Sequence, residues 1–176
     1  MKVFFHTLGC KVNQYETQEM REQLNKNGYE ITEDENVADI FVVNSCTVTS
    51  ESDRKTRQCV RHYKKKYPES TVVLTGCMPQ SFPHMAEQLT EADIVLGNKN
   101  NKLLVASLDE YFTDNCRCLH LEQHQSGEPL VSSGISSFEE RTRAILKIED
   151  GCDRFCSYCI IPKARGRVRW KPIEDV

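Results

Sequence analysis

The sequence has no apolar run that approaches the roughly 18 residues a membrane-spanning helix needs. Residues 2–6 hold one lysine and only three apolar residues, too few for the apolar core of a signal peptide. Internal repeats and long low-complexity tracts are also missing. We therefore expect a soluble, cytoplasmic protein without a membrane partner.

The composition is that of a globular chain. Hydrophobic residues make up 39% and charged residues 28% of the 176 residues, unlike the low hydrophobicity and high charge of disordered segments. This length suits one domain, or one domain and part of a second, and it buries roughly 70% of the unfolded surface. The chain can therefore form a core without disulfide bonds.

Cysteine, by contrast, is abundant and odd in number, since the chain has nine. A disulfide framework is not expected in a reducing cytosol. The cysteines therefore indicate metal binding, redox chemistry or core packing.

Acidic residues are missing from two short segments of a chain whose net charge is -3. Residues 54–66 hold seven Lys and Arg residues and residues 163–171 hold five, which is 12 of the chain's 23 basic residues. Two basic segments on an otherwise acidic chain indicate a polyanionic partner that docks at defined places.

Residues 1–112 alternate between short apolar runs and helix-like patterns. This alternation predicts an α/β fold with a parallel sheet and helices on both faces. The expected strands are residues 3–8, 29–31, 40–43, 72–74 and 94–96. The expected helices are residues 13–27, 54–67, 79–89 and 104–111.

The apolar pattern is lost in residues 113–140, which are rich in Ser, Gly, Glu and His and are predicted to be an interdomain linker. A new strand is expected at residues 144–148, and residues 141–176 are interpreted as the incomplete start of a second domain. One strand and one loop cannot bury enough surface to fold independently. We therefore expect a truncated product or a fragment of a longer chain.

Three cysteines lie just beyond the carboxyl ends of three different predicted strands. They are Cys10, Cys46 and Cys77. The carboxyl ends of parallel strands line one edge of a sheet, where ligands bind, so the three thiols could converge there. Gly9 and Gly76 would let the backbone approach closely. The alternative interpretation is three unrelated core cysteines.

A second group consists of Cys152, Cys156 and Cys159, with the spacing C-x3-C-x2-C. Because an iron–sulfur cubane normally takes four cysteines, three on one loop would leave one iron open. A zinc ribbon would need a second C-x2-C pair about 15 to 20 residues away. None follows in the sequence, so zinc is the weaker alternative.

Four segments around these cysteines carry a family resemblance. They are residues 7–14 (TLGCKVNQ), 43–49 (VNSCTVT), 74–80 (LTGCMPQ) and 148–166 (IEDGCDRFCSYCIIPKARG). Together they resemble the methylthiotransferase family of radical S-adenosylmethionine enzymes. Lys11, Val12 and Asn13 make the first segment most similar to the branch that modifies threonylcarbamoyladenosine in tRNA.

The resemblance implies a flavodoxin-like domain over residues 1–112, followed by the first strand and cluster loop of a truncated radical S-adenosylmethionine barrel. It implies that Cys10, Cys46 and Cys77 hold an auxiliary [4Fe–4S] cluster. It implies that Cys152, Cys156 and Cys159 hold the radical [4Fe–4S] cluster, with Tyr158 beside S-adenosylmethionine.

The implied reaction adds a methylthio group to carbon 2 of threonylcarbamoyladenosine next to the anticodon. It would need tRNA, an electron donor and a sulfur donor, and we expect the 176-residue chain alone to be inactive. Three cysteines match none of the family segments: Cys59 is interpreted as helix packing, and Cys116 and Cys118 as incidental.

The basic helix offers four candidate RNA contacts, namely Arg54, Lys55, Arg57 and Arg61. The helix follows the Cys46 loop, so it would begin at the cysteine edge. Residues 54, 57 and 61 fall on one helical face, which could hold phosphates beside the modified base. The alternative is a solvated helix surface.

Two functions of other classes stay open on the residues alone. One is a non-catalytic iron–sulfur module that uses the same cysteines, and the other is a zinc-stabilised RNA-binding protein. Metal analysis distinguishes the zinc protein, and reductive cleavage of S-adenosylmethionine distinguishes the enzyme from the module. The residues do not indicate an oligomeric state.

Overall fold

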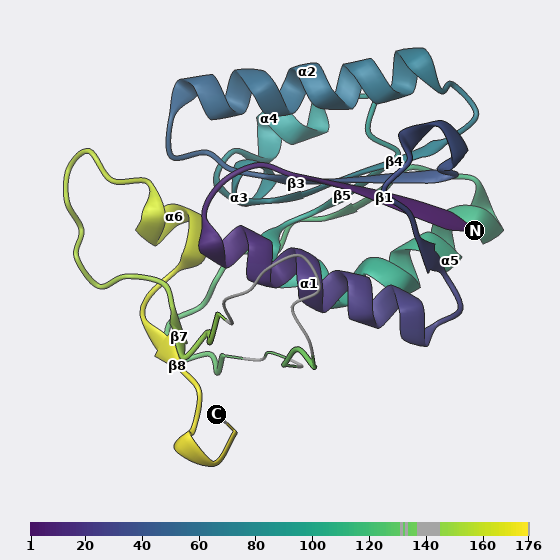
Figure 1. Ribbon diagram of the computed structural model, residues 1–176. Coiled ribbons are helices and arrows are strands. Elements are labelled where there is room, and N and C mark those ends of the chain that lie inside the picture. Colours follow the sequence, from purple (N-terminus) through teal and green to yellow (C-terminus); the bar gives the residue numbers. More distant parts are fainter. Residues whose placement is uncertain (131, 133, 137–144, 176) are drawn as a thin grey trace.

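The computed structural model describes residues 1–130, 132, 134–136 and 145–175 (Figure 1). Its centre is a sheet of six parallel strands in the order β2-β1-β3-β4-β5-β6. The strands are β1 (Lys2–Thr7), β2 (Glu30–Ile31), β3 (Ile40–Ser45), β4 (Thr71–Gly76), β5 (Ile94–Leu96) and β6 (Cys118–His120). The order 2-1-3-4-5 is that of flavodoxin-like folds. The predicted α/β, flavodoxin-like sheet is therefore confirmed, and β6 extends it.

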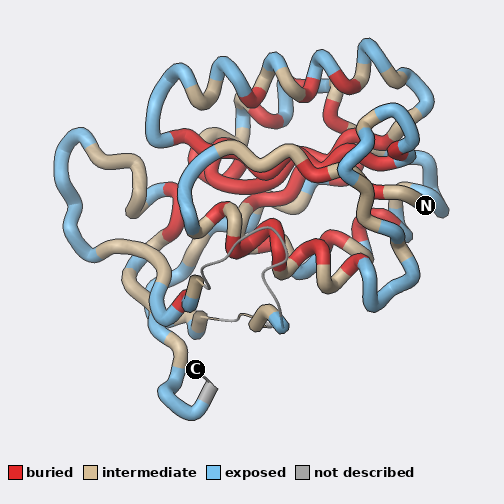
Figure 2. The backbone as a smooth tube through the Cα atoms, in the orientation of Figure 1, coloured by how far each residue is buried: buried red, intermediate tan, exposed pale blue. Residues whose placement is uncertain are grey.

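Helices cover both faces of the sheet (Figure 1). One face carries α1 (Lys11–Lys26) and α5 (Leu104–Asp114), and the other carries α2 (Ser50–Lys66) and α4 (Pro83–Glu87). Every residue of β3 and β4 is buried, as expected for central strands covered on both faces (Figure 2). Among the described helices, none combines the length and apolar character that a bilayer crossing requires.

The predicted helix at residues 79–89 is two short helices. α3 (Cys77–Ser81) continues directly from β4, and α4 starts at Pro83. Between them Phe82 has φ -132°, because a following proline disfavours helical backbone in the residue before it.

The sheet also continues into the segment predicted to be a linker. α5 extends to Asp114, and residues 118–120 form β6, which pairs with β5. Part of the segment predicted to be a linker thus belongs to the sheet. A three-residue edge strand with one buried side chain, Cys118, is too short to produce a recognisable apolar pattern.

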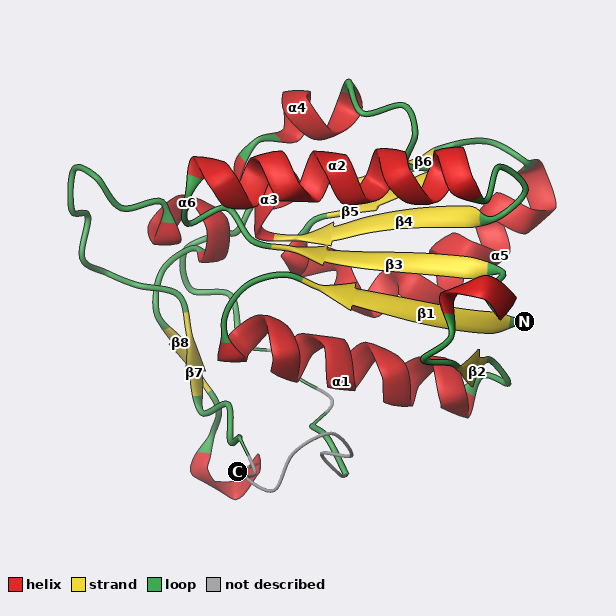
Figure 3. Cartoon of the chain, turned by 45° about the horizontal axis from the view of Figure 1, so that its top comes forward, coloured by secondary structure: helices red, strands yellow, loops and turns green. Residues whose placement is uncertain are grey.

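Residues 145–175, called here the C-terminal unit, lie beyond the carboxyl ends of the strands, next to α3 (Figure 3). They contain β7 (Glu149–Asp150), α6 (Ile161–Arg165), β8 (Arg169–Trp170) and a 3₁₀ helix (Ile173–Asp175). β7 and β8 form an antiparallel pair. These two short strands are the only strands among the described residues of the C-terminal unit, and the expected barrel start stays a prediction.

The strand expected at residues 144–148 is not found where the structure can test it. Ala144 lies outside the described residues, and residues 145–148 form no strand. Leu146 and Ile148 are 63% and 52% exposed, so their apolar side chains have no packed layer in the described part of the chain. Lys147 between them is buried instead and forms ion pairs with Glu16 and Asp150.

Candidate metal centre

The strand register brings Cys10, Cys46 and Cys77 to the same edge of the sheet. Cys10 caps the start of α1 after β1, whereas Cys46 and Cys77 directly follow β3 and β4. β1 pairs with β3, and β3 pairs with β4, up to their last residues. The chain order reverses between β1 and β3, which is the switch point where open α/β sheets bind ligands. The predicted placement of the three cysteines at one edge is therefore observed.

Two glycines keep space open at this edge. Gly9 has φ +122°, and a Cβ atom there would lie 2.9 Å from the Cys46 Cβ atom. Gly76 has φ +100°, and a Cβ atom there would collide with the Ser45 carbonyl oxygen. A side chain at Gly9 would thus fill the gap between the Cys10 and Cys46 loops, which agrees with the expected close backbone approach.

Asn13 and Asn44 hold the first two cysteine loops together. The Asn13 amide nitrogen donates to the Asn44 side-chain oxygen at 3.2 Å and to the Ser45 carbonyl at 3.0 Å. The Asn44 amide nitrogen donates in return to the Asn13 carbonyl at 2.9 Å. The Asn13 side-chain oxygen accepts from the Cys10 backbone and thiol at 3.4 and 3.3 Å. Both asparagines are fully buried, so these bonds fix the loops.

The three thiols differ in environment. Cys10 is exposed, whereas Cys46 and Cys77 are buried. Burial raises the pKa of the Cys77 thiol to about 11, and the charge of Arg165 opposes that rise. The Cys77 sulfur accepts from an Arg165 guanidinium nitrogen at 3.5 Å and from the Asn98 amide at 3.9 Å. Bound metal would reverse the effect of burial, since coordination deprotonates a thiol.

The donor set suits an iron–sulfur cluster. Iron–sulfur clusters take cysteine thiolates, and this edge presents three, with a cation beside the most deeply buried one. In the described ranges no three Cys, His, Asp or Glu side chains are already gathered closely enough to hold a metal ion. The three thiols therefore share one edge of the sheet and one chemistry, and their role as cluster ligands stays a prediction.

The second cysteine group lies on the loop between β7 and α6. The Cys152 backbone nitrogen donates to the Gly166 carbonyl at 3.1 Å, and that of Cys159 donates to the Cys156 carbonyl at 3.0 Å. Cys156 is exposed, and Tyr158 is 90% exposed. Cys156 and Cys159 line an open hollow together with Phe155, Pro162 and Lys163. The loop is therefore accessible to a cluster and to a small ligand.

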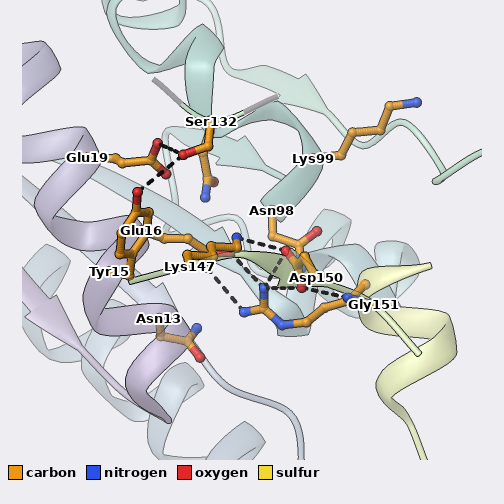
Figure 4. A network of polar contacts seen from close by, with 12 residues as sticks. Asn13, Tyr15, Glu16, Glu19, Asn98, Lys99, Ser132, Lys147, Asp150 and Gly151 are labelled. Atoms are coloured by element: carbon orange, nitrogen blue, oxygen red, sulfur yellow. Dashed lines mark hydrogen bonds and ion pairs between the residues drawn. The ribbon is translucent and has the colours of Figure 1, made fainter. Parts of the chain in front are cut away.

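A buried ion cluster, which the sequence analysis did not find, joins the C-terminal unit to α1. Its members are Glu16, Lys147, Asp150 and Arg165, whose side chains are each at most 8% exposed. Figure 4 shows Lys147 and Asp150 pointing toward Glu16 on α1. No sequence pattern pairs Glu16 with partners more than 130 residues away. The only signal was the position of Arg165 in the segment 148–166, which carries the family resemblance.

A second ion cluster fixes the neighbouring segment, residues 124–128. Glu128 pairs with Arg169 at 2.7 Å, with Lys99 at 3.1 Å and with His124 at 2.6 Å. Burial opposes ionisation of Glu128, but hydrogen bonds from His124, the Gln125 backbone and Lys99 hold its pKa at about 2. This cluster borders a cavity of about 270 Å³ beside α1.

The candidate RNA helix, α2, begins four residues after Cys46, at the cysteine edge as expected (Figure 3). Arg54 pairs with Glu51 at 2.6 Å, and Arg61 pairs with Glu91 at 3.0 Å. Lys55 is exposed and lies 4.0 Å from Glu51. Arg57 is only half-exposed, and one of its terminal nitrogens is buried. The Arg57 side chain thus turns partly toward the protein, and the role of the four residues in RNA binding stays a prediction.

Two of the three remaining cysteines pack in the core. Cys59 packs against the core under α2, as expected, and its sulfur lies 3.4 Å from a His6 ring nitrogen. Cys118 is a buried core residue of β6. Cys116 is exposed.

Known proteins are similar to this chain over nearly its whole length. Residues 2–97 match the family described as "Uncharacterized protein family UPF0004". Three similar proteins carry the name threonylcarbamoyladenosine tRNA methylthiotransferase MtaB. That of Bacillus subtilis is 37% identical over 174 residues, which is 99% of this chain and 39% of the relative. That of Aquifex aeolicus is 37% identical over 185 residues (100% and 43%), and that of Thermotoga maritima is 40% identical over 177 residues (98% and 38%). The chain thus spans about two fifths of the length of the relatives it matches.

Proposed function

The chain belongs to the methylthiotransferase family, and we propose that it is part of a radical S-adenosylmethionine enzyme that methylthiolates tRNA. The proposed substrate position is carbon 2 of threonylcarbamoyladenosine next to the anticodon. The names of the three relatives support this substrate. Because the chain spans only part of those relatives, the activity is proposed for the whole protein.

One observation carries the proposal, which is the delivery of Cys10, Cys46 and Cys77 to the switch point of the sheet. These three residues would hold the auxiliary [4Fe–4S] cluster. Cys152, Cys156 and Cys159 would hold the radical [4Fe–4S] cluster. When bound, the two clusters and S-adenosylmethionine supply the electron, the hydrogen-abstracting radical, the sulfur and the methyl group.

The chain's own residues position these groups. Asn13 and Asn44 fix the loops of Cys10 and Cys46, and Gly9 leaves room between them. The ion cluster around Arg165 holds the C-terminal unit, with its own cysteines, against the Cys77 edge. Tyr158 precedes Cys159 in the chain and is 90% exposed, so its ring is available to S-adenosylmethionine.

The tRNA would approach the same edge along α2. Arg54, Lys55 and Arg61 are exposed there, and exposed ion pairs such as Arg54–Glu51 contribute little free energy. A phosphate group can therefore displace Glu51 or Glu91 as the partner of these arginines. Arg57 would have to turn outward to join them.

Metal analysis of the anaerobically reconstituted whole protein tests this function against its alternatives. The proposal predicts iron and sulfide, whereas stoichiometric zinc without iron would indicate the zinc-stabilised protein. Two products would then be measured. One is 5′-deoxyadenosine formed from S-adenosylmethionine under reducing conditions, and the other is methylthiolated nucleoside in tRNA. Iron without either product would indicate the non-catalytic module, which would still need an electron donor but no sulfur donor.

A further inference from the structure

Arg165 contacts both sides of the boundary between the C-terminal unit and the sheet. Its guanidinium donates to both Glu16 carboxylate oxygens at 2.7 and 3.2 Å. It also donates to both Asp150 oxygens at 3.2 and 3.1 Å, and to the Cys77 sulfur at 3.5 Å. The Arg165 side chain is 5% exposed. One side chain thus touches α1, the strand before the Cys152 loop and the last cysteine of the sheet edge.

The charged groups around Arg165 are buried and pair with one another. Lys147 completes the cluster by pairing with Glu16 at 3.1 Å and with Asp150 at 2.8 Å. Two acids and two bases are balanced in charge, but each is buried and costly to leave unpaired. The observed packing of residue 147, β7 and α6 against α1 pairs all four groups. A buried network of this kind contributes a defined geometry more than net stability.

We propose that Arg165 is a positioning residue that joins the two cysteine groups. It locks the Cys152–Cys159 loop in place relative to Cys77, and it keeps a permanent positive charge beside the Cys77 ligand. The first role depends only on contacts within the chain. The second rests on the proposed function, because it requires a cluster at Cys10, Cys46 and Cys77.

Lys147 and Arg167 provide matched controls. Lys147 belongs to the same buried cluster but makes no described contact with Cys77, so Lys147→Gln removes an equal charge from the same network. Arg167 lies two residues from Arg165, is 55% exposed, and pairs with Asp153 at 3.7 Å. Arg167→Gln therefore removes an arginine of the same segment without breaking the network.

The locking role is tested by hydrogen exchange in the whole protein before cluster reconstitution. Arg165→Gln and Lys147→Gln should each raise amide exchange across residues 147–170 by at least tenfold relative to the parent. Arg167→Gln should leave exchange there unchanged. Parent-like exchange in Arg165→Gln would overturn the locking role, and so would an equal rise in Arg167→Gln.

The charge role is tested by dithionite titration of the reconstituted whole protein, in which Cys152, Cys156 and Cys159 are replaced by alanine. The remaining cluster is then the one at Cys77. Loss of a positive charge disfavours the reduced cluster, so Arg165→Gln should lower its ratio of reduced to oxidised form about tenfold at fixed potential. This equals about 59 mV for a one-electron couple. Lys147→Gln should change the ratio less than threefold.

The conservative variant Arg165→Lys keeps the charge and should leave the ratio within threefold of the parent, even if Arg165→Gln does not fold. An equal change of the reduced-to-oxidised ratio in Arg165→Gln and Lys147→Gln would overturn the charge role. A tenfold change of that ratio in Arg165→Lys would overturn it as well. A parent that assembles no cluster at Cys10, Cys46 and Cys77 overturns the proposed function together with the charge role. The exchange experiment then still decides the locking role.

Discussion

The side chains of Asn13 and Asn44 bond to each other's residues in both directions. Asn13 donates to the Asn44 side-chain oxygen at 3.2 Å, and Asn44 donates to the Asn13 carbonyl at 2.9 Å. One residue follows β1 and the other belongs to β3, so the pair ties together the two loops that carry Cys10 and Cys46. This link lies between β1 and β3, where the strand order of the sheet reverses.

Asn13→Ala should therefore destabilise the fold. It leaves the Asn44 side-chain oxygen and the Ser45 carbonyl buried without this donor, which costs roughly 2 to 4 kcal/mol of unfolding free energy. Urea unfolding measures the loss. Asn25→Ala, at an exposed position of α1, is the control and should change stability by less than about 0.5 kcal/mol. Equal effects of the two substitutions would contradict the role of the asparagine pair.

Gly9→Ala should lower both stability and iron binding. The substitution strains a residue at φ +122° and places a methyl group 2.9 Å from the Cys46 Cβ atom. Gly28→Ala is the control, because Gly28 also has positive φ but has no atom within 4 Å of its added Cβ. Both variants should lose roughly 1 to 3 kcal/mol through backbone strain. Only Gly9→Ala should reduce the iron bound after reconstitution, and normal iron in that variant would count against a cluster at this edge.

Glu128 makes stability depend on pH. Burial opposes its ionisation, but the hydrogen bonds from His124, Gln125 and Lys99 hold its pKa at about 2, below the ordinary 4.5. A lowered folded-state pKa stabilises the protein above pH 4.5, and this contribution is lost as the pH falls toward 2. Glu128→Gln should thus cost roughly 1 to 3 kcal/mol at pH 7 and progressively less below pH 4.5. Urea unfolding across this range is the measurement.

The exposed Glu122, whose side chain is 67% exposed near Lys99, gives the control for that series. Glu122→Gln should have little effect on stability at any pH. A stability difference between Glu128→Gln and the parent that stays constant from pH 7 to pH 3 would contradict the electrostatic origin.

The proposed tRNA contact of α2 predicts a change in salt dependence. Each phosphate contact contributes roughly 0.7 to 0.9 to the log–log slope of affinity against salt. Arg54→Ala combined with Arg57→Ala should weaken tRNA binding by the whole protein and flatten this slope by about one to two units, with iron content unchanged. Lys26→Ala, at the far end of α1, should leave the slope as in the parent. A slope unaffected by the double substitution would indicate that this face of α2 is a solvated surface and does not bind tRNA.

The sequence was sufficient to predict the main features of the fold because they depend on local patterns. Fully apolar strands such as residues 40–43 and 72–74 alternate with helices, and that alternation determines a parallel sheet. The position of the three cysteines followed from their offset to those strands. Their role as cluster ligands stays a prediction, as do the domain boundaries.

The features that sequence analysis missed depend on distant partners. β6 is held by pairing with β5 across more than 20 residues, and its own three residues carry no periodic signal. The Glu16–Arg165 contact joins residues 149 apart, and each looks like an ordinary surface charge when read alone. Arg57 fell on the expected helical face, but helical periodicity does not show which way a long side chain turns.

The most direct test of the two-cluster arrangement is the iron content of the reconstituted whole protein and of two triple variants. The parent should bind about eight irons, from two four-iron clusters. Replacing Cys10, Cys46 and Cys77 by alanine should leave about four, and replacing Cys152, Cys156 and Cys159 should leave about four of the other set. Full iron content in both triple variants would contradict the assignment of either group as cluster ligands.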